Sequence, residues 1–323
     1  MPSYVARPDL ESLLEAMARQ TGDPRAGIFG PESMTWRVSR EAALFLGAGR
    51  AALLQLAHPW VAAAILEHSR VLGDPIARFH NTFRIVFTVI FGSREQAFAA
   101  ARHLHTLHTG IRGDLPEAVG SWPAGAPYEA NEVSALRWVY ATLIDTAVLA
   151  YTTVLPLEET EREQYYQESK RMAALFGIPP EALPADWAGF AAYNQEMAAS
   201  DTLGVSAAAR RLGGAILSGA GSWIHPPHWY RALTVEWLPP RLREEFGLRR
   251  TMSDTRSAAR ARRWLPRAWR ALPPPVRFVG PYQEARARLE AARVRPWTRW
   301  SNRFWIGQSA LPFSNAGHGL PQR

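Results

Sequence analysis

The sequence of 323 residues contains no cysteine. This absence excludes disulfides, iron–sulfur clusters, thiolate-ligated haem, covalently attached c-type haem and cysteine nucleophiles. Any metal must therefore be held by histidine, a carboxylate or tyrosine. A chain without disulfides suits a reducing compartment, and we expect a cytoplasmic protein.

Lysine is almost absent, because Lys170 is the only lysine among 37 basic residues. The formal net charge is +8 and the sequence pI is about 10.2, so nearly all of the positive charge is arginine. A high pI alone does not indicate nucleic-acid binding, and we expect no nucleic-acid partner. Arginine binds carboxylate and propionate groups in a bidentate manner and also suits anionic membrane surfaces.

The chain lacks an uninterrupted apolar run of membrane-span length. Residues 1–20 carry three acidic side chains and no basic-then-apolar pattern, so we do not expect them to be a signal peptide. Residues 42–66 and 138–157 approach the required length, but Arg50 and Asp145 interrupt them. Ionisable groups in mid-span are costly in lipid, so we expect both to be buried core helices.

Helix signals dominate the remainder, and we find no internal repeat, no long alternating run typical of a sheet and no glycine-rich phosphate loop. The sequence therefore predicts an all-α fold with a single large helical domain. Three parts are expected, namely an N-terminal helix and linker over 1–30, the helical domain over 31–240 and a C-terminal extension over 241–323. That extension is rich in arginine, tryptophan and proline.

Two long helices are predicted near the centre of the chain. The first runs over 76–91, with Gly92 after it as a C-cap. Ser93 and Gln96 form a capping-box pattern that opens the second, which we expect to end at Gly113. Residues 114–127 predict an ordered loop rich in proline and glycine.

Histidine is concentrated between residues 54 and 113. This stretch holds six of the nine histidines of the chain. Polar side chains buried in apolar helices without partners cost on the order of 1–3 kcal/mol each, so they are tied into local hydrogen bonds or kept for a ligand. The six residues are His58, His68, His80, His103, His105 and His108.

Arg84 and Thr88 interrupt the apolar helix predicted over 76–91. They are four residues apart and therefore lie on one face. Because the surrounding residues are apolar all round, the helix is predicted to be buried. A buried arginine requires an anion, which here is either a ligand carboxylate or an Asp or Glu of the protein.

His105 and His108 stand three residues apart on the next predicted helix. Two histidines at that spacing can share a metal, and a single histidine can serve as an axial haem ligand. The alternative is a histidine that faces solvent or packs in the core. No His-Glu-x-x-His pattern is present.

His58 and His68 flank a predicted helix break at Pro59. Either can point inward, or bind a backbone carbonyl near the break. A non-haem metal site built from these histidines, His105 or His108, with a carboxylate such as Glu67 or Asp145, is therefore an open alternative.

Five segments in order resemble the MpaB/rubber-oxygenase catalytic domain, the family of the latex-clearing proteins. The resemblance covers roughly residues 30 to 240. The segments are Gln55-Leu-Ala-His-Pro59, His68-Ser-Arg70 leading to Asp74-Pro75, Arg84-x-x-x-Thr88 with Phe91-Gly92, His108-x-x-Ile-x-Gly113 and Leu136-x-Trp-Val-x-Ala-Thr-Leu143.

This resemblance implies a globin-like, latex-clearing-protein type of helical fold that holds haem b. It implies an oxygenase that uses O2 on an apolar, unsaturated, isoprenoid-like substrate. By motif position, His108 is the expected haem-iron ligand, and Arg84 and Thr88 are the expected catalytic and cofactor-binding residues beside the haem. His58 and His68 match further positions of the cofactor pocket.

The sequence also departs from the family. Phe87 stands where the latex-clearing enzymes have lysine, Glu67 and His68 are the nearest candidates for their acidic residue, and Tyr140 replaces a histidine found in many relatives. A different class of function is a peripheral lipid-binding protein, in which the arginine- and tryptophan-rich segment after Pro239 contacts the membrane. Such peripheral membrane contact is also compatible with the oxygenase.

Overall fold

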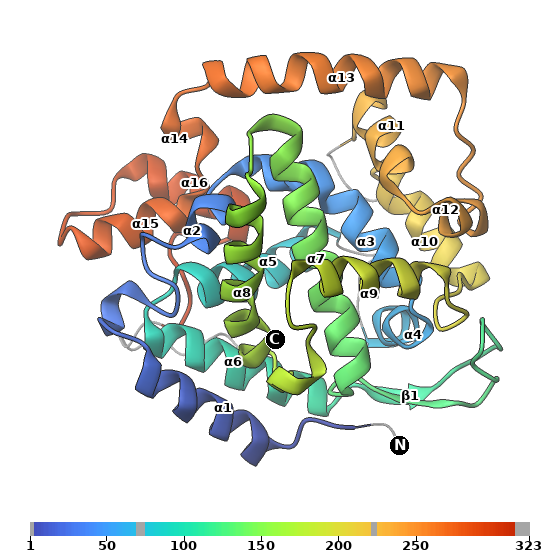
Figure 1. The fold of residues 1–323 in the computed structure, drawn as a ribbon, viewed down its shortest axis with the longest axis horizontal. Helices are drawn as coiled ribbons and strands as arrows, with labels where there is room; N and C mark the ends of the chain where they lie inside the picture. The colour runs from blue at the N-terminus through green and yellow to red at the C-terminus, as the bar shows by residue number, and fades with distance from the viewer. Residues whose placement is uncertain (1–2, 69–74, 221–224, 314–323) are drawn as a thin grey trace.

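The other elements pack around α7, Val133–Val154, which crosses the middle of the molecule (Figure 1). The computed structural model describes residues 3–68, 75–220 and 225–313. Within them the fold is all-α, as predicted, with one hairpin of two short strands. The side chain of Glu132 caps α7 by accepting a hydrogen bond from the Ala135 N–H at 2.8 Å.

Within the described residues, α7 is the one helix long and apolar enough to cross a membrane. Its most apolar window is 67% buried inside the protein. Asp145, which interrupts the apolar run, accepts a hydrogen bond from Arg50 at 2.7 Å. α7 is therefore a core helix of this fold, as the sequence predicts.

The elements before α7 include the α5–α6 helical hairpin, in which the two helices pack against each other. They are α1 Arg7–Gln20, η1 Pro24–Ala26, α2 Met34–Ser39, η2 Ala42–Gly47, α3 Ala48–Leu56, α4 Pro59–His68, α5 Pro75–Phe91, α6 Arg94–Thr109, β1 Arg112–Asp114 and β2 Pro127–Glu129.

The predicted capping box opens α6. The Ser93 hydroxyl accepts a hydrogen bond from the Gln96 N–H at 3.2 Å, and the Gln96 side chain accepts one from the Ser93 N–H at 2.9 Å. The predicted end at Gly113 is wrong, because α6 ends at Thr109 and Gly113 lies in β1. β1 pairs antiparallel with β2, so the segment between them closes a hairpin.

The elements after α7 surround it and extend toward the C-terminus. They are α8 Glu159–Leu175, η3 Pro180–Ala182, α9 Trp187–Ala199, α10 Ala207–Ser218, α11 His228–Trp237, α12 Pro240–Glu245, α13 Met252–Ala271, α14 Pro274–Arg277, α15 Gly280–Leu289 and α16 Pro296–Ile306. α13 lies along the outer edge of the molecule, at the top of Figure 1. α16 packs back on α5.

A ladder of aromatic side chains fixes the inner face of α5. Phe79, Phe83, Phe87 and Phe91 recur every fourth residue, with successive ring centroids 4.6, 5.5 and 5.9 Å apart. This spacing places them on one helix face, where Phe83, Phe87 and Phe91 join the main hydrophobic core. Phe83 and Phe87 also line one side of the cavity described below.

Candidate functional site

His108 lies near the C-terminal end of α6 and makes no side-chain hydrogen bond to any residue that the structure describes. Burial lowers the pKa of His108 to about 4, and the neighbouring His105 contributes a smaller lowering. The imidazole is therefore neutral at physiological pH. His108 is half-buried, and a neutral imidazole with no competing partner among the described residues is the form in which histidine binds iron.

His58 is the second histidine without a satisfied ring nitrogen. Its side chain is buried, and its Nδ1 has no hydrogen-bond partner among the described residues. Burial lowers the pKa of His58 to about 4. The ring lies beside Trp60 and Trp122, whose ring centroids are each 6.1 Å from it and 4.6 Å from each other. The indole Nε1 of Trp60 is also buried without a described partner.

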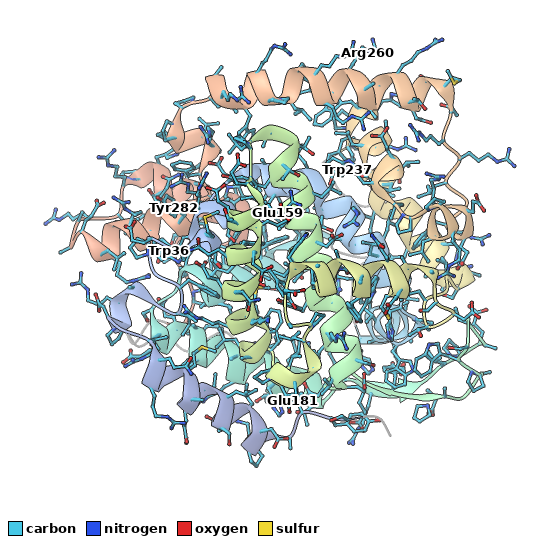
Figure 2. The ribbon with its side chains drawn as sticks, viewed as in Figure 1. Trp36, Glu159, Glu181, Trp237, Arg260 and Tyr282 are labelled. Atoms are coloured by element: carbon cyan, nitrogen blue, oxygen red, sulfur yellow. The ribbon has the colours of Figure 1, made fainter. Side chains whose placement is uncertain are left out.

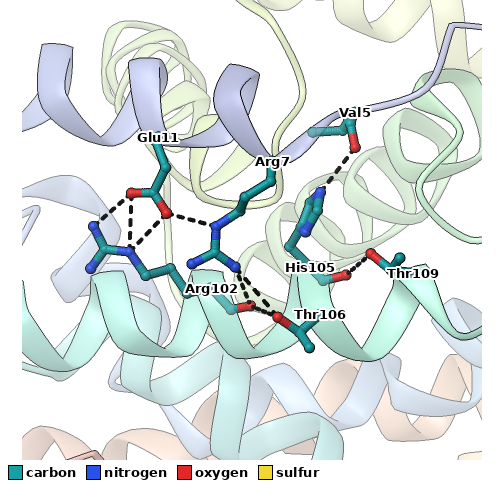
Figure 3. Close-up of polar contacts among 7 residues, drawn as sticks. All are labelled: Val5, Arg7, Glu11, Arg102, His105, Thr106 and Thr109. Atoms are coloured by element: carbon teal, nitrogen blue, oxygen red, sulfur yellow. Dashed lines mark hydrogen bonds and ion pairs between the residues drawn. The ribbon is translucent and has the colours of Figure 1, made fainter.

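His105 is held by the N-terminal segment. Its Nε2 lies 2.9 Å from the Val5 carbonyl oxygen (Figure 3). Beside it, Glu11 accepts hydrogen bonds from Arg7 at 2.7 Å and from Arg102 at 2.7 Å, which ties α1 to α6. These contacts give His105 a structural role, although it lies only three residues from His108.

The remaining predicted histidines lie at the surface of the same region. His80 Nε2 is 3.0 Å from the Phe304 carbonyl oxygen of α16. His68 is exposed and lies 4.0 Å from Glu67, whose carboxylate accepts a hydrogen bond from the Tyr128 hydroxyl at 2.5 Å. His103 is exposed.

The residues between His68 and α5 lie outside the described residues. This segment includes Ser69-Arg70 and Asp74 of the motif that extends from His68. Within the described residues, no three or more His, Cys, Asp or Glu side chains cluster in a way that could hold a metal ion. The described part of the chain therefore does not form the non-haem, multi-ligand site that the sequence left open.

Arg84 and Thr88 lie on one face of α5, as their spacing predicts. The Arg84 Nε donates to the Ile306 carbonyl at 2.6 Å and Nη1 donates to the Asn81 side chain at 2.9 Å. Burial lowers the pKa of Arg84. The expected anion is not its partner among the described residues, because a backbone carbonyl of α16 takes that place.

Thr88 is fully buried, and its hydroxyl donates to the Arg84 carbonyl at 2.6 Å. This bond to the preceding turn satisfies the hydroxyl without a ligand. In this structure Arg84 therefore connects α5 to α16, and Thr88 binds the backbone of α5 itself. Their predicted role beside a haem stays a prediction.

A second arginine and threonine, Arg78 and Thr82, repeat the same spacing six residues earlier. At 1.5 Å per residue, Arg78 and His108 each lie roughly 20 Å from the connection between α5 and α6, whereas Arg84 lies roughly 10 Å closer to it. Burial lowers the pKa of Arg78. The repeated spacing is the sequence signal that marks Arg78. Its position along α5, about as far from the α5–α6 connection as His108 is along α6, follows from the hairpin and the ideal helix rise.

An apolar cavity of about 90 Å³ lies between η2, α5, α7 and α8. Its wall includes Phe45, Phe83 and Phe87, and the Trp305 ring of α16 stacks on Phe45 at 4.1 Å. Ligand pockets measure about 300–1,000 Å³, so this cavity accepts a short apolar segment and not a haem. His108 does not line it.

Tyr140 and Glu41 are both occupied by protein contacts. The buried Tyr140 hydroxyl lies 2.6 Å from the Ser169 hydroxyl, and burial raises the pKa of this tyrosine. Glu41 lines the cavity, but its carboxylate accepts a hydrogen bond from Arg277 at 2.6 Å and one from the Trp269 indole at 2.9 Å. Neither side chain is left for a ligand in this structure.

These features define an all-α protein with a neutral histidine that has no described hydrogen bond on the α5–α6 hairpin, and with an aromatic cavity lined by α5. The model of the family described as ER-bound oxygenase mpaB/B′/Rubber oxygenase, catalytic domain, matches residues 36–267. The chain therefore belongs to this oxygenase family. No curated protein and no solved structure matched the chain.

Proposed function

We propose that the protein is a haem b-dependent oxygenase that uses O2 on an apolar, unsaturated, isoprenoid-like substrate. The observation that carries the proposal is the state of His108, which is half-buried, neutral and without a described hydrogen bond in a chain of this oxygenase family. A single axial histidine fits the donor set, since no multi-ligand cluster forms among the described residues.

Haem, when bound, supplies the O2 chemistry, and the protein supplies its binding and surroundings. His108 is assigned as the residue that holds the iron. Burial keeps its imidazole in the neutral form at pH 7, so that no proton has to leave before binding. His105, tied to the Val5 carbonyl, fixes the last turns of α6 and thereby the position of His108.

Two arginines of α5 are candidates for the cation beside the haem. Arg84, the residue expected from the motif, is engaged by the Ile306 carbonyl of α16. Arg78 also interacts with the protein, but the ideal rise of both helices places it about as far from the α5–α6 connection as His108. We therefore assign Arg78 as the better candidate to bind a propionate, because arginine binds carboxylates in a bidentate manner. Replacing each arginine separately distinguishes the two assignments.

The aromatic cavity is assigned as part of the path for the apolar substrate. Its lining by Phe83 and Phe87 excludes water and offers no acid or base at the position where the latex-clearing enzymes have lysine. Glu41, the carboxylate in its wall, is paired with Arg277. The reaction here therefore does not use a lysine at that position.

The test is to express the chain with haem supplied, purify it, and record its absorption spectrum and iron content. We expect one haem per chain, and O2 consumption with carbonyl products when an isoprenoid oligomer is added. Failure to bind haem stoichiometrically would overturn the cofactor assignment. Another metal in stoichiometric amount would instead support the non-haem alternative.

A further inference from the structure

The outer face of α13 carries a row of five exposed arginines. At 100° per residue these positions fall within an arc of about 80°, and they extend over about 21 Å of helix. No other residue type with a charge occurs on this arc. The five are Arg256, Arg260, Arg263, Arg267 and Arg270.

The opposite face of α13 is buried against the protein. Ser257, Ala258, Ala261 and Leu265 lie on it, and the helix packs along α11 and α7. α13 therefore lies flat on the molecule and presents its arginines outward. Figure 2 shows Arg260 at this outer edge, and Figure 1 shows the helix running straight along it.

The positive charge of this row is not compensated within the part of the chain that the structure describes. None of the five arginines forms an ion pair with a described carboxylate. Arg262, which lies off the arc, shows the contrast, because its guanidinium pairs with Glu236. Like charges on one helix face repel one another, so the row has an electrostatic cost that an anionic partner removes.

Exposed aromatic side chains lie on α13 and on nearby α16. Trp264 of α13 is 43% exposed. On α16, Trp297, Trp300 and Phe304 are 43, 54 and 43% exposed, and their rings stack in succession at 4.8 and 6.3 Å. The Trp297 indole donates to the Pro275 carbonyl of α14, the helix that follows α13. Tryptophan and arginine together are typical of a membrane–water interface.

We propose that the outer face of α13 is a docking surface for an anionic lipid membrane. A flat row of charges of one sign complements a planar anionic surface. A helix that recognises DNA protrudes into a groove, whereas α13 lies flat along the outer edge of the molecule with its opposite face packed on α11 and α7. This proposal does not depend on the proposed haem chemistry.

The test is co-sedimentation of the full chain with vesicles of phosphatidylcholine, with and without phosphatidylserine. One variant replaces the five row arginines with glutamine. The matched control replaces five exposed arginines from elsewhere with glutamine and removes the same formal charge. The control positions are Arg19, Arg112, Arg210, Arg211 and Arg249.

We expect the wild type and the control to bind phosphatidylserine vesicles and to ignore pure phosphatidylcholine. An arginine near an anionic surface contributes about fivefold to partitioning, so the row variant is expected to lose at least about a hundredfold. Binding is expected to fall as salt rises from about 0.15 M to about 1 M, where the Debye length falls from about 8 Å to about 3 Å. Circular dichroism confirms that both variants fold.

Three outcomes would overturn the proposal. The first is no binding of the wild type to phosphatidylserine vesicles. The second is an equal loss in the row variant and the control, which would show a general charge effect. The third is row-dependent binding of a duplex DNA or RNA oligonucleotide, measured by fluorescence anisotropy, that is tighter than binding to the vesicles.

Discussion

The end of α6 and the middle of α5 were both predicted to flank a haem, yet the structure treats their polar residues differently. His108 has no described hydrogen-bond partner, and burial lowers its pKa to about 4. Arg84 interrupts an apolar helix, but a carbonyl of α16 and the Asn81 side chain engage its guanidinium. The family resemblance singled out both residues, and the structure shows that their chemical availability differs.

A polar residue of a helix is therefore a candidate to bind a ligand only when no other group in the fold forms a hydrogen bond or an ion pair with it. His105 makes the same point within one helix, since it lies three residues from His108 and is bound by Val5. The contacts that occupy His105 and Arg84 come from the two ends of the chain, namely the N-terminal segment and α16. The following predictions test whether His108 binds a ligand and whether His105 and Arg84 are structural.

The largest effect is expected for His108→Ala. Removal of the only assigned iron ligand should abolish stoichiometric haem binding and lower oxygenase activity by more than about a hundredfold. The matched control is His105→Ala, which should retain the Soret band and lose only the contact to the Val5 carbonyl. An unchanged Soret band in His108→Ala would assign the ligand elsewhere.

The next largest effect is expected in the pH dependence of the free energy of unfolding. Burial lowers the pKa values of His58 and His108 from 6.5 to about 4, so the folded apoprotein binds fewer protons than the unfolded chain between these values. The free energy of unfolding should therefore fall as the pH falls from 6.5 to 4, by about 3 kcal/mol for each histidine. Urea denaturation at a series of pH values measures it.

A double variant, His58→Gln with His108→Gln, is the control for this pH profile. Glutamine does not titrate, so the variant should show a flatter dependence between pH 6.5 and 4. If wild-type stability were constant across that range, these histidines would not be held neutral by the fold.

Arg84→Gln and Arg78→Gln form a matched pair on α5. Arg84→Gln should lower the free energy of unfolding by about 1–3 kcal/mol, because the Ile306 carbonyl loses its donor, and the haem spectrum should be kept. Arg78→Gln should instead weaken haem binding, which a haem titration measures. The reverse pattern would restore Arg84 as the cation beside the haem.

The smallest effect is expected for Tyr140→Phe, which asks whether this tyrosine replaces the histidine of many relatives. Its hydroxyl bonds only Ser169, which also donates to the Tyr166 carbonyl and so keeps a partner. We expect a loss of about 1 kcal/mol in denaturant unfolding and no change in the Soret band. A shifted band or a large fall in activity would place Tyr140 in the reaction.

Local sequence signals predicted the start of a helix correctly where the residues that form its cap are close together in the chain. The Ser93–Gln96 box opens α6, because this motif closes within one turn. The predicted end of α6 at Gly113 was wrong for the opposite reason. Pairing of β1 with β2 joins residues fifteen or so positions apart, and no local pattern near Gly113 encodes it.

The same distinction between local motifs and long-range contacts applies to the candidate site. Motif order predicted the oxygenase family, which the match over residues 36–267 confirms. It also singled out His108, whose role stays a prediction. The spacing of His105 and His108 did not distinguish which of the two is the metal ligand. Arg84 and Thr88 are separated by the same four positions as Arg78 and Thr82, so spacing did not distinguish these two pairs either. Periodicity fixes which residues share a helix face, but it carries no information on what covers that face.

The sequence by itself determined the helical class, the family and a short set of polar residues, because helix periodicity, caps and motif order are properties of neighbouring positions. The tertiary structure decided which of those residues is left for a ligand. Val5 satisfies His105 and Ile306 satisfies Arg84 across about 100 and 222 positions of the chain, respectively. Only packing can bring such partners together, and packing leaves the His108 ring and His58 Nδ1 without a partner among the described residues.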